Sequence, residues 1–103
     1  MKKKSYKLAK LEQNRYSIIT DNLDYCYLCG KQKQHLHEVF FGNNRVNSMK
    51  YGCIVPLCAL CHTKVHNDIQ IDLKLKKSLE KAFIKVYECD TDYFIKIFHK
   101  NYL

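Results

Sequence analysis

Four of the six cysteines fall into two Cys-x-x-Cys pairs, and this pattern constrains the fold more than any other feature of the chain. Cys26 and Cys29 form the first pair, Cys58 and Cys61 form the second, and 28 residues lie between the pairs. Two such pairs supply the four thiolates of a closed tetrahedral zinc site. A redox role is the alternative, but neither pair lies in a thioredoxin-like βαβ pattern. We therefore predict a structural Zn²⁺, which takes no part in catalysis because it has no open coordination position.

Length and charge narrow the class of protein. At 103 residues the chain is long enough for one compact domain. It has no long apolar run and its lysine-rich start does not resemble an export signal, so we expect no membrane span and a cytoplasmic location. A formal net charge of +8 favours a polyanionic partner such as nucleic acid, although charge alone would also suit any basic protein. Cys53 and Cys89 lie outside the pairs, and we expect each to be a buried free thiol.

The first half of the chain is predicted to contain a basic segment and a β-hairpin. Residues 1–16 form a basic segment, which begins with a solvated arm over 1–5 and continues with one or two helical turns within Tyr6–Tyr16. The β-branched segment 17–20 is short enough for a brief strand. The hairpin is predicted from strands over 35–41 and 52–55, the turn-rich residues 42–45 between them, and Pro56 as the end of the second strand.

The second half is predicted to be helical. One helix should begin at the second cysteine pair and reach about Asn67. From Leu75 onward, apolar residues recur at helical spacing, which predicts an amphipathic helix over 73–88 with its lysines facing outward. Asp90 should cap a last short helix. We expect a single domain, 1–103, made of a basic segment (1–16), a zinc-bound core (17–67) and C-terminal helices (73–103).

Histidines gather around the predicted hairpin and helix. His37 and Glu38 lie on the first strand, and His35 shares a strand face with His37 because side chains two residues apart point the same way. His62 follows the last cysteine directly, and His66 lies one helical turn further on, a spacing that one metal ion can bridge. Alternatively, His62 or His66 covers the zinc site or caps the helix end.

This arrangement of strand histidine, cysteine pairs and helix histidines resembles the HNH, or ββα-metal, nuclease family. The resemblance covers most of the chain from Leu11 and is most specific from Cys26 to His66. It implies an α+β fold, in which a small zinc-stapled ββα unit carries flanking C-terminal helices. The segments similar to small HNH proteins of phages of low-GC Gram-positive bacteria are His37–Arg45, Tyr51-Gly52, Val55–Cys58 and the C-terminal residues 93–103.

The resemblance implies a DNA endonuclease that nicks or cuts both strands with a divalent cation, Mg²⁺ or Mn²⁺, with Ni²⁺ or Zn²⁺ as further options. Many family members carry Asp-His or His-His on the strand, whereas this chain has His37-Glu38, so two registers stay open. In the first, His37 binds the cation with His62 and His66, and Glu38 deprotonates water. In the second, His37 is the base, and Glu38 binds the cation or orients His37. His62 belongs to the catalytic set in both.

DNA is the implied partner, contacted mainly through its phosphate backbone. Arg45, Lys50 and Lys64 are the candidate contacts, and such contacts predict steep salt dependence with little base specificity. The family context places the protein in the cytoplasm of a bacterial host and leaves homodimerisation open. The main alternative is a catalytically inactive zinc module that only binds nucleic acid. A RING-like protein-interaction domain is less favoured, because its ligand pattern for two zinc ions is incomplete.

Overall fold

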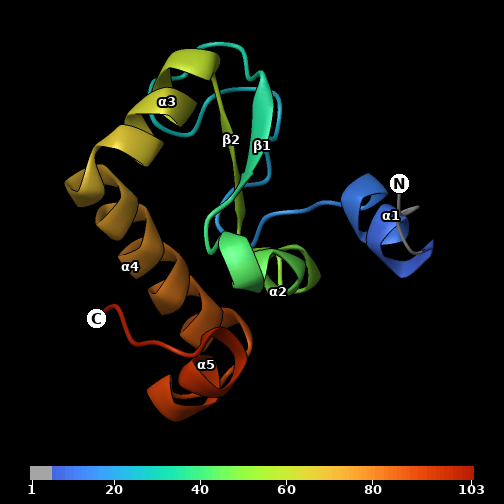
Figure 1. Ribbon diagram of the computed structural model, residues 1–103, viewed down its shortest axis with the longest axis vertical. Helices are drawn as coiled ribbons and strands as arrows, with labels where there is room; N and C mark the ends of the chain where they lie inside the picture. Colours follow the sequence, from blue (N-terminus) through green and yellow to red (C-terminus); the bar gives the residue numbers. More distant parts are fainter. Residues whose placement is uncertain (1–5) are drawn as a thin grey trace.

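The computed structural model describes residues 6–103, so residues 1–5, the start of the predicted basic segment, lie outside the described part. A β-hairpin lies at the centre, helix α1 on one side of it, and helices α3 to α5 on the other side and below (Figure 1). The molecule is a small α+β protein in which the hairpin leads directly into a helix, as predicted. The elements are α1 (Tyr6–Gln13), β1 (His35–Glu38), the 3₁₀ helix η1 (Gly42–Asn44), α2 (Arg45–Lys50), β2 (Ile54–Leu57), α3 (Ala59–Asn67), α4 (Ile69–Val86) and α5 (Thr91–Phe98).

Strands β1 and β2 pair in antiparallel fashion, with His37 opposite Val55. The first strand is shorter than the predicted 35–41. The Val39 N–H still donates to the Cys53 carbonyl at 3.0 Å, but the Phe40 backbone N–H donates to Ser48 Oγ at 3.1 Å instead of to the second strand. The prediction of a turn-rich loop between the strands missed α2, because a helix of 6 residues is too short to show an apolar repeat.

Pro56 does not end the second strand, so that prediction was wrong. Strand β2 includes Pro56, which lies opposite Leu36. Proline lacks a backbone N–H and is tolerated on edge strands, and both strands of a two-stranded sheet are edges. The Pro56 carbonyl accepts a hydrogen bond from the Tyr27 N–H at 2.8 Å, which ties the loop carrying the first cysteine pair to the hairpin.

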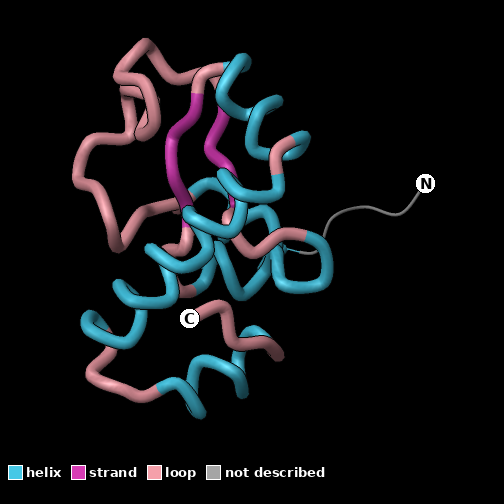
Figure 2. Tube along the Cα trace, turned by 90° about the vertical axis from the view of Figure 1, so that its left-hand side faces the viewer, coloured by secondary structure: helices cyan, strands magenta, loops and turns pink. Residues whose placement is uncertain are grey.

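A long loop connects α1 to β1 and runs beside the strands (Figure 2). The brief strand predicted over 17–20 does not form. The Ile18 N–H donates to the Gly52 carbonyl at 2.9 Å, which fastens the loop to the hairpin without adding a strand. Gly52 has a φ of +73°, and a Cβ at this position would collide with the Tyr16 ring, so both its backbone and its surroundings require glycine.

Three helices complete the chain, and aspartates cap the last two. Helix α3 ends at Asn67, as predicted, and Asp68 accepts hydrogen bonds from the Gln70 and Ile71 N–H groups at the start of α4. Helix α4 therefore begins before the predicted residue 73, because the cap and not the apolar stripe fixes its first turn. Asp90 caps α5 through the Tyr93 N–H at 2.9 Å, as predicted.

Aromatic rings join the C-terminal helices to the hairpin. Phe40, just after β1, packs against Phe98 of α5 with ring centroids 4.5 Å apart, and Phe83 of α4 lies 5.3 Å from Phe94. All four rings are buried. Within residues 6–103, no helix is both long and apolar enough to cross a membrane.

Candidate functional site

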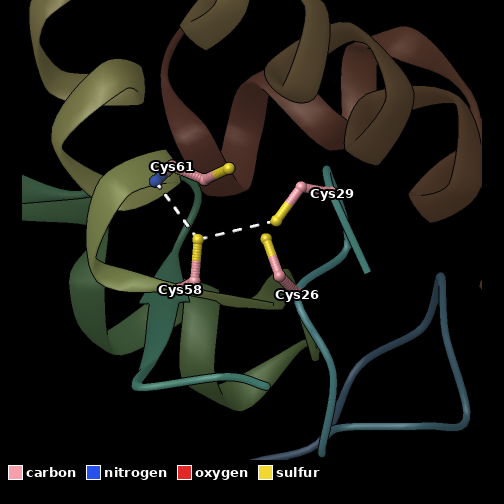
Figure 3. Close-up of side chains that lie close together, drawn as sticks. All are labelled: Cys26, Cys29, Cys58 and Cys61. Carbon is pink, nitrogen blue, oxygen red and sulfur yellow. Dashed lines mark hydrogen bonds between the residues drawn. The ribbon is translucent and has the colours of Figure 1, made fainter. Parts of the chain in front are cut away.

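Four cysteine sulfurs converge where the long loop meets the start of α3. Cys26 and Cys29 come from the loop, Cys58 caps α3, and Cys61 lies in its first turn (Figure 3). The four Sγ atoms lie within 4.8 Å of one another. The Cys29 and Cys58 sulfurs are 3.6 Å apart, close to the separation of about 3.8 Å that tetrahedral Zn–S bonds impose. All four thiols are free of disulfides, and the group is consistent with a structural Zn²⁺.

Backbone N–H groups favour the metal-binding thiolate form of Cys58 and Cys26, whereas burial raises the pKa of the Cys61 thiol to about 12. The Cys61 N–H donates to Cys58 Sγ at 3.5 Å and lowers the pKa of that thiol. Burial raises the pKa of the Cys26 thiol, but surrounding backbone N–H groups outweigh burial and lower it to about 6. Gly30, with a φ of 79°, lets the chain turn directly after the first pair. The cluster thus connects the loop to the hairpin-to-helix junction.

Three histidines meet on the inner side of the same junction. His37 of β1 is 3 % exposed, and its ring centroid lies 5.1 Å from that of His62 and 5.3 Å from that of His66, both on α3. The His62 and His66 Nε2 atoms are 3.2 Å apart. One nitrogen from each ring lies within 4.8 Å of the others. These three residues, the histidine triad, therefore form a second group that could hold a metal ion.

The protonation states of His37 and His62 suit metal binding. Burial, followed by the neighbouring His62 and His66, lowers the pKa of His37 to about 4, and burial also lowers the pKa of His62. A neutral imidazole offers a lone pair to a cation. His37 Nε2 is buried and has no hydrogen-bond partner among the described residues, a situation that costs about 1–3 kcal/mol. A cation between the three rings would satisfy this nitrogen.

Glu38 is not part of the triad. Successive strand residues point to opposite faces, and Glu38 Oε1 accepts hydrogen bonds from Arg15 at 2.8 Å and from Arg45 at 3.2 Å. Arg45 also pairs with Glu12 at 2.9 Å. Glu12, Arg15, Glu38 and Arg45, the arginine–glutamate cluster, therefore join α1, β1 and α2 behind the strand that carries His37.

The remaining predicted residues lie at the surface. Lys50 and Lys64 are exposed, at the end of α2 and on α3, whereas Arg45 is partly buried in its ion pairs. His35 is exposed and its ring centroid lies 4.7 Å from that of His62, at the edge of the triad. Of the two unpaired cysteines, Cys53 is buried as predicted, whereas Cys89 is only partly buried.

Two residues beside the triad were missed. The Phe41 ring lies 5.3 Å from that of His66, and Lys76 Nζ lies 4.3 Å from the Phe41 centroid. The amphipathic pattern predicted the lysines of α4 to face solvent. Lys76 precedes the buried Leu79 and Phe83 at helical spacing, and this spacing could have identified it as facing inward.

No family model, curated protein or solved structure matches the chain. The chemistry of the two clusters, and not a relative, therefore carries the functional assignment.

Proposed function

We propose that this chain is a single-domain, metal-dependent DNA endonuclease of the HNH type, encoded by a phage or prophage. The observation that carries the proposal is the convergence of three imidazoles from β1 and α3 beside a four-cysteine cluster, with a buried nitrogen of His37 lacking a partner. The sequence resemblance supports the same reading, since it assigns a metal site to the positions of His37 and His62.

In this proposal His37, His62 and His66 hold a divalent cation. The cation would polarise the scissile phosphate and neutralise the charge that builds up on it. Three imidazoles without a carboxylate suit Zn²⁺ or Ni²⁺ better than Mg²⁺, which prefers oxygen ligands. Zn²⁺ and Ni²⁺ therefore become the favoured cofactors among the four that the resemblance allowed.

With His37 in the metal set, Glu38 becomes the proposed general base. It accepts a proton from water, the resulting hydroxide oxygen bonds to phosphorus, and the bond from phosphorus to the leaving sugar oxygen breaks. That oxygen then takes a proton from solvent. Its carboxylate accepts hydrogen bonds from Arg15 and Arg45 on the strand face opposite His37, so this step requires the Glu38 side chain to turn toward the triad when DNA binds.

Phosphate contacts would hold the DNA across the triad. Lys50 and Lys64 are exposed, and the chain carries a net charge of +8, which supports binding to a polyanion. Arg45 could serve the same purpose from its place beside Glu38. A symmetric pair of chains would cut both strands, whereas a single chain would nick.

A plasmid-cleavage assay with added Zn²⁺, Ni²⁺, Mn²⁺ or Mg²⁺ tests the proposal. We expect cleavage by the native protein and a loss of at least about a hundredfold in His37→Ala, His62→Ala and Glu38→Gln. His99→Ala, in an exposed residue outside both clusters, is the matched control and should cleave normally. Equal inactivity of native protein and variants with every metal, together with retained DNA binding, would instead favour the catalytically inactive nucleic-acid-binding module.

A further inference from the structure

Lys76 is an inward-facing cation on α4. Its side chain is 13 % exposed, and its Nζ forms an ion pair with Asp72 Oδ2 at 2.7 Å. The same ammonium lies 4.3 Å from the centroid of Phe41 and 5.6 Å from that of Tyr102. An ammonium is most stable when it is hydrated, so the partial burial of Lys76 has to be compensated by the fold. The ion pair and the two rings do this and hold the ammonium in one position.

The Phe41 ring connects the fixed ammonium to the histidine triad. Phe41, over which it sits, packs against His66 with centroids 5.3 Å apart and against His37 at 6.0 Å. Lys76 therefore supplies a positive charge on the side of the triad that Phe41 covers, where it would attract an anionic ligand of the proposed cation.

We propose that Lys76 is a phosphate-binding residue of this site, which donates to a non-bridging oxygen of a phosphate held at the triad. The inference rests on the proposed function, because it takes the triad as the place where a phosphodiester binds. An ammonium has three donors, and Asp72 accepts from one of them, so donors remain for the ligand. A preorganised cation beside developing negative charge stabilises it without reorganisation during the reaction.

A purely structural role is the competing explanation, in which the ion pair only fastens the first turns of α4 beside Phe41. The two explanations differ in what Asp72 does. If Lys76 acts only through the ion pair, replacing Asp72 should weaken phosphate binding as much as replacing Lys76 does. If Lys76 acts on phosphate, Asp72→Asn keeps the ammonium and leaves phosphate binding intact or stronger.

The test is calorimetric titration of inorganic phosphate into protein loaded with Zn²⁺ at the cysteines and Co²⁺ at the triad. Lys76→Met should weaken phosphate binding by about tenfold or more, the loss expected for a charged hydrogen bond. Lys76→Arg and Asp72→Asn should stay within about threefold of the native value. Lys77→Met, the neighbouring exposed lysine of α4, is the matched control and should have no effect. If Lys76→Met does not fold, Lys76→Gln replaces it, because its polar head suits the same position.

Equal phosphate affinity in the native protein and Lys76→Met would overturn the inference, as would an equal loss in Asp72→Asn and Lys76→Met. Absence of any phosphate binding by the native protein would overturn it too. The readout needs no catalysis: Lys76-dependent phosphate binding without plasmid cleavage would retain this inference while the nuclease proposal falls.

Discussion

The environment of His37 determines what its imidazole can do. The ring is almost fully buried between β1 and α3, next to two further imidazoles, and these surroundings disfavour a positive charge. A histidine of this kind is neutral over the whole physiological range. It is suited to binding a cation and poorly suited to carrying a proton, which favours the metal-ligand role that the first of the two registers gives to His37 but says nothing for Glu38 as the base.

The same burial predicts an acid-dependent loss of stability in protein whose triad is metal-free. The pKa of His37 falls from its ordinary 6.5 to about 4 in the folded state. Between these values the unfolded chain binds more protons, so this contribution is fully present above pH 6.5 and is lost as the pH falls toward 4. We expect the free energy of unfolding to fall by about 1.5 kcal/mol between pH 6.5 and 5 on this account.

Urea unfolding at several pH values measures this effect as a difference between the native protein and His37→Phe. Both proteins keep the cysteine site, so acid effects on zinc cancel in the comparison. A parallel pH dependence in the two proteins would show that His37 is already protonated in the fold.

At the residue scale, sequence reasoning found the metal-ligand candidates and missed their neighbours. Metal chemistry restricts ligands to a few residue types at short spacings, so the cysteine pairs and the pair of His62 and His66 could be recognised. The arginine–glutamate cluster could not, because Arg45 and Glu12 are 33 positions apart and any acidic residue could have been the partner. Lys76 was missed because a single lysine is normally solvated.

At the scale of elements, α3 depends on the cysteine cluster for its position. It has two buried residues, Cys61 and Val65, and one of these is itself a proposed zinc ligand. A short helix with so small an apolar face is not stable alone. Zinc would therefore determine whether α3 stays packed against β1. Because His62 and His66 lie on α3 and His37 lies on β1, the histidine triad would form only when α3 is in this position.

Removing one thiolate should release α3. Cys58→Ser is expected to lose the bound zinc and most of the hydrogen-exchange protection of α3, because zinc binding and folding are coupled in such sites. Metal analysis and exchange mass spectrometry report the two effects. The control is Cys89→Ser, a free thiol outside the cluster, which should retain its zinc. Full zinc content in Cys58→Ser would rule out the four-thiolate site.

Helix α1 is held by charge as well as by packing. Arg45 lies between Glu12 of α1 and Glu38 of β1, in partly buried ion pairs. Arg45→Met would take one cationic partner away from both Glu12 and Glu38, and we expect it to destabilise the fold by about 1–2 kcal/mol. Exchange protection should fall first in α1. A loss spread evenly over all helices would contradict a local role for the cluster.

The element-scale errors share one cause: tertiary contacts override local signals. Pro56 ends strands that need its N–H, but the hairpin has two free edges and does not need it. Helix α2 is too short for periodicity to reveal it. By contrast, α5 could be predicted, because Asp90 and the apolar face of Phe94 and Phe98 are signals within one short segment.

At the scale of the whole molecule, a net charge of +8 on 103 residues should make the proposed DNA binding strongly dependent on salt. Lys50→Ala and Lys64→Ala are each expected to reduce the slope of log affinity against log salt by about one, as for the loss of a single phosphate contact. Fluorescence anisotropy with a labelled duplex measures the slope. Unchanged slopes in both variants would place the DNA on another face of the protein.

Helices α3 and α4 are separated by a single residue, Asp68, which lies at the end of one and caps the other. A junction of one residue cannot accommodate an inserted or deleted residue without moving one helix relative to the other. Each residue of an α-helix rotates the chain by about 100° about the helix axis. One amino acid inserted at the junction would therefore rotate α4 relative to α3 and move the Lys76 side chain away from Phe41. The junction should therefore accept substitutions but reject insertions and deletions, in contrast to the long loop before β1.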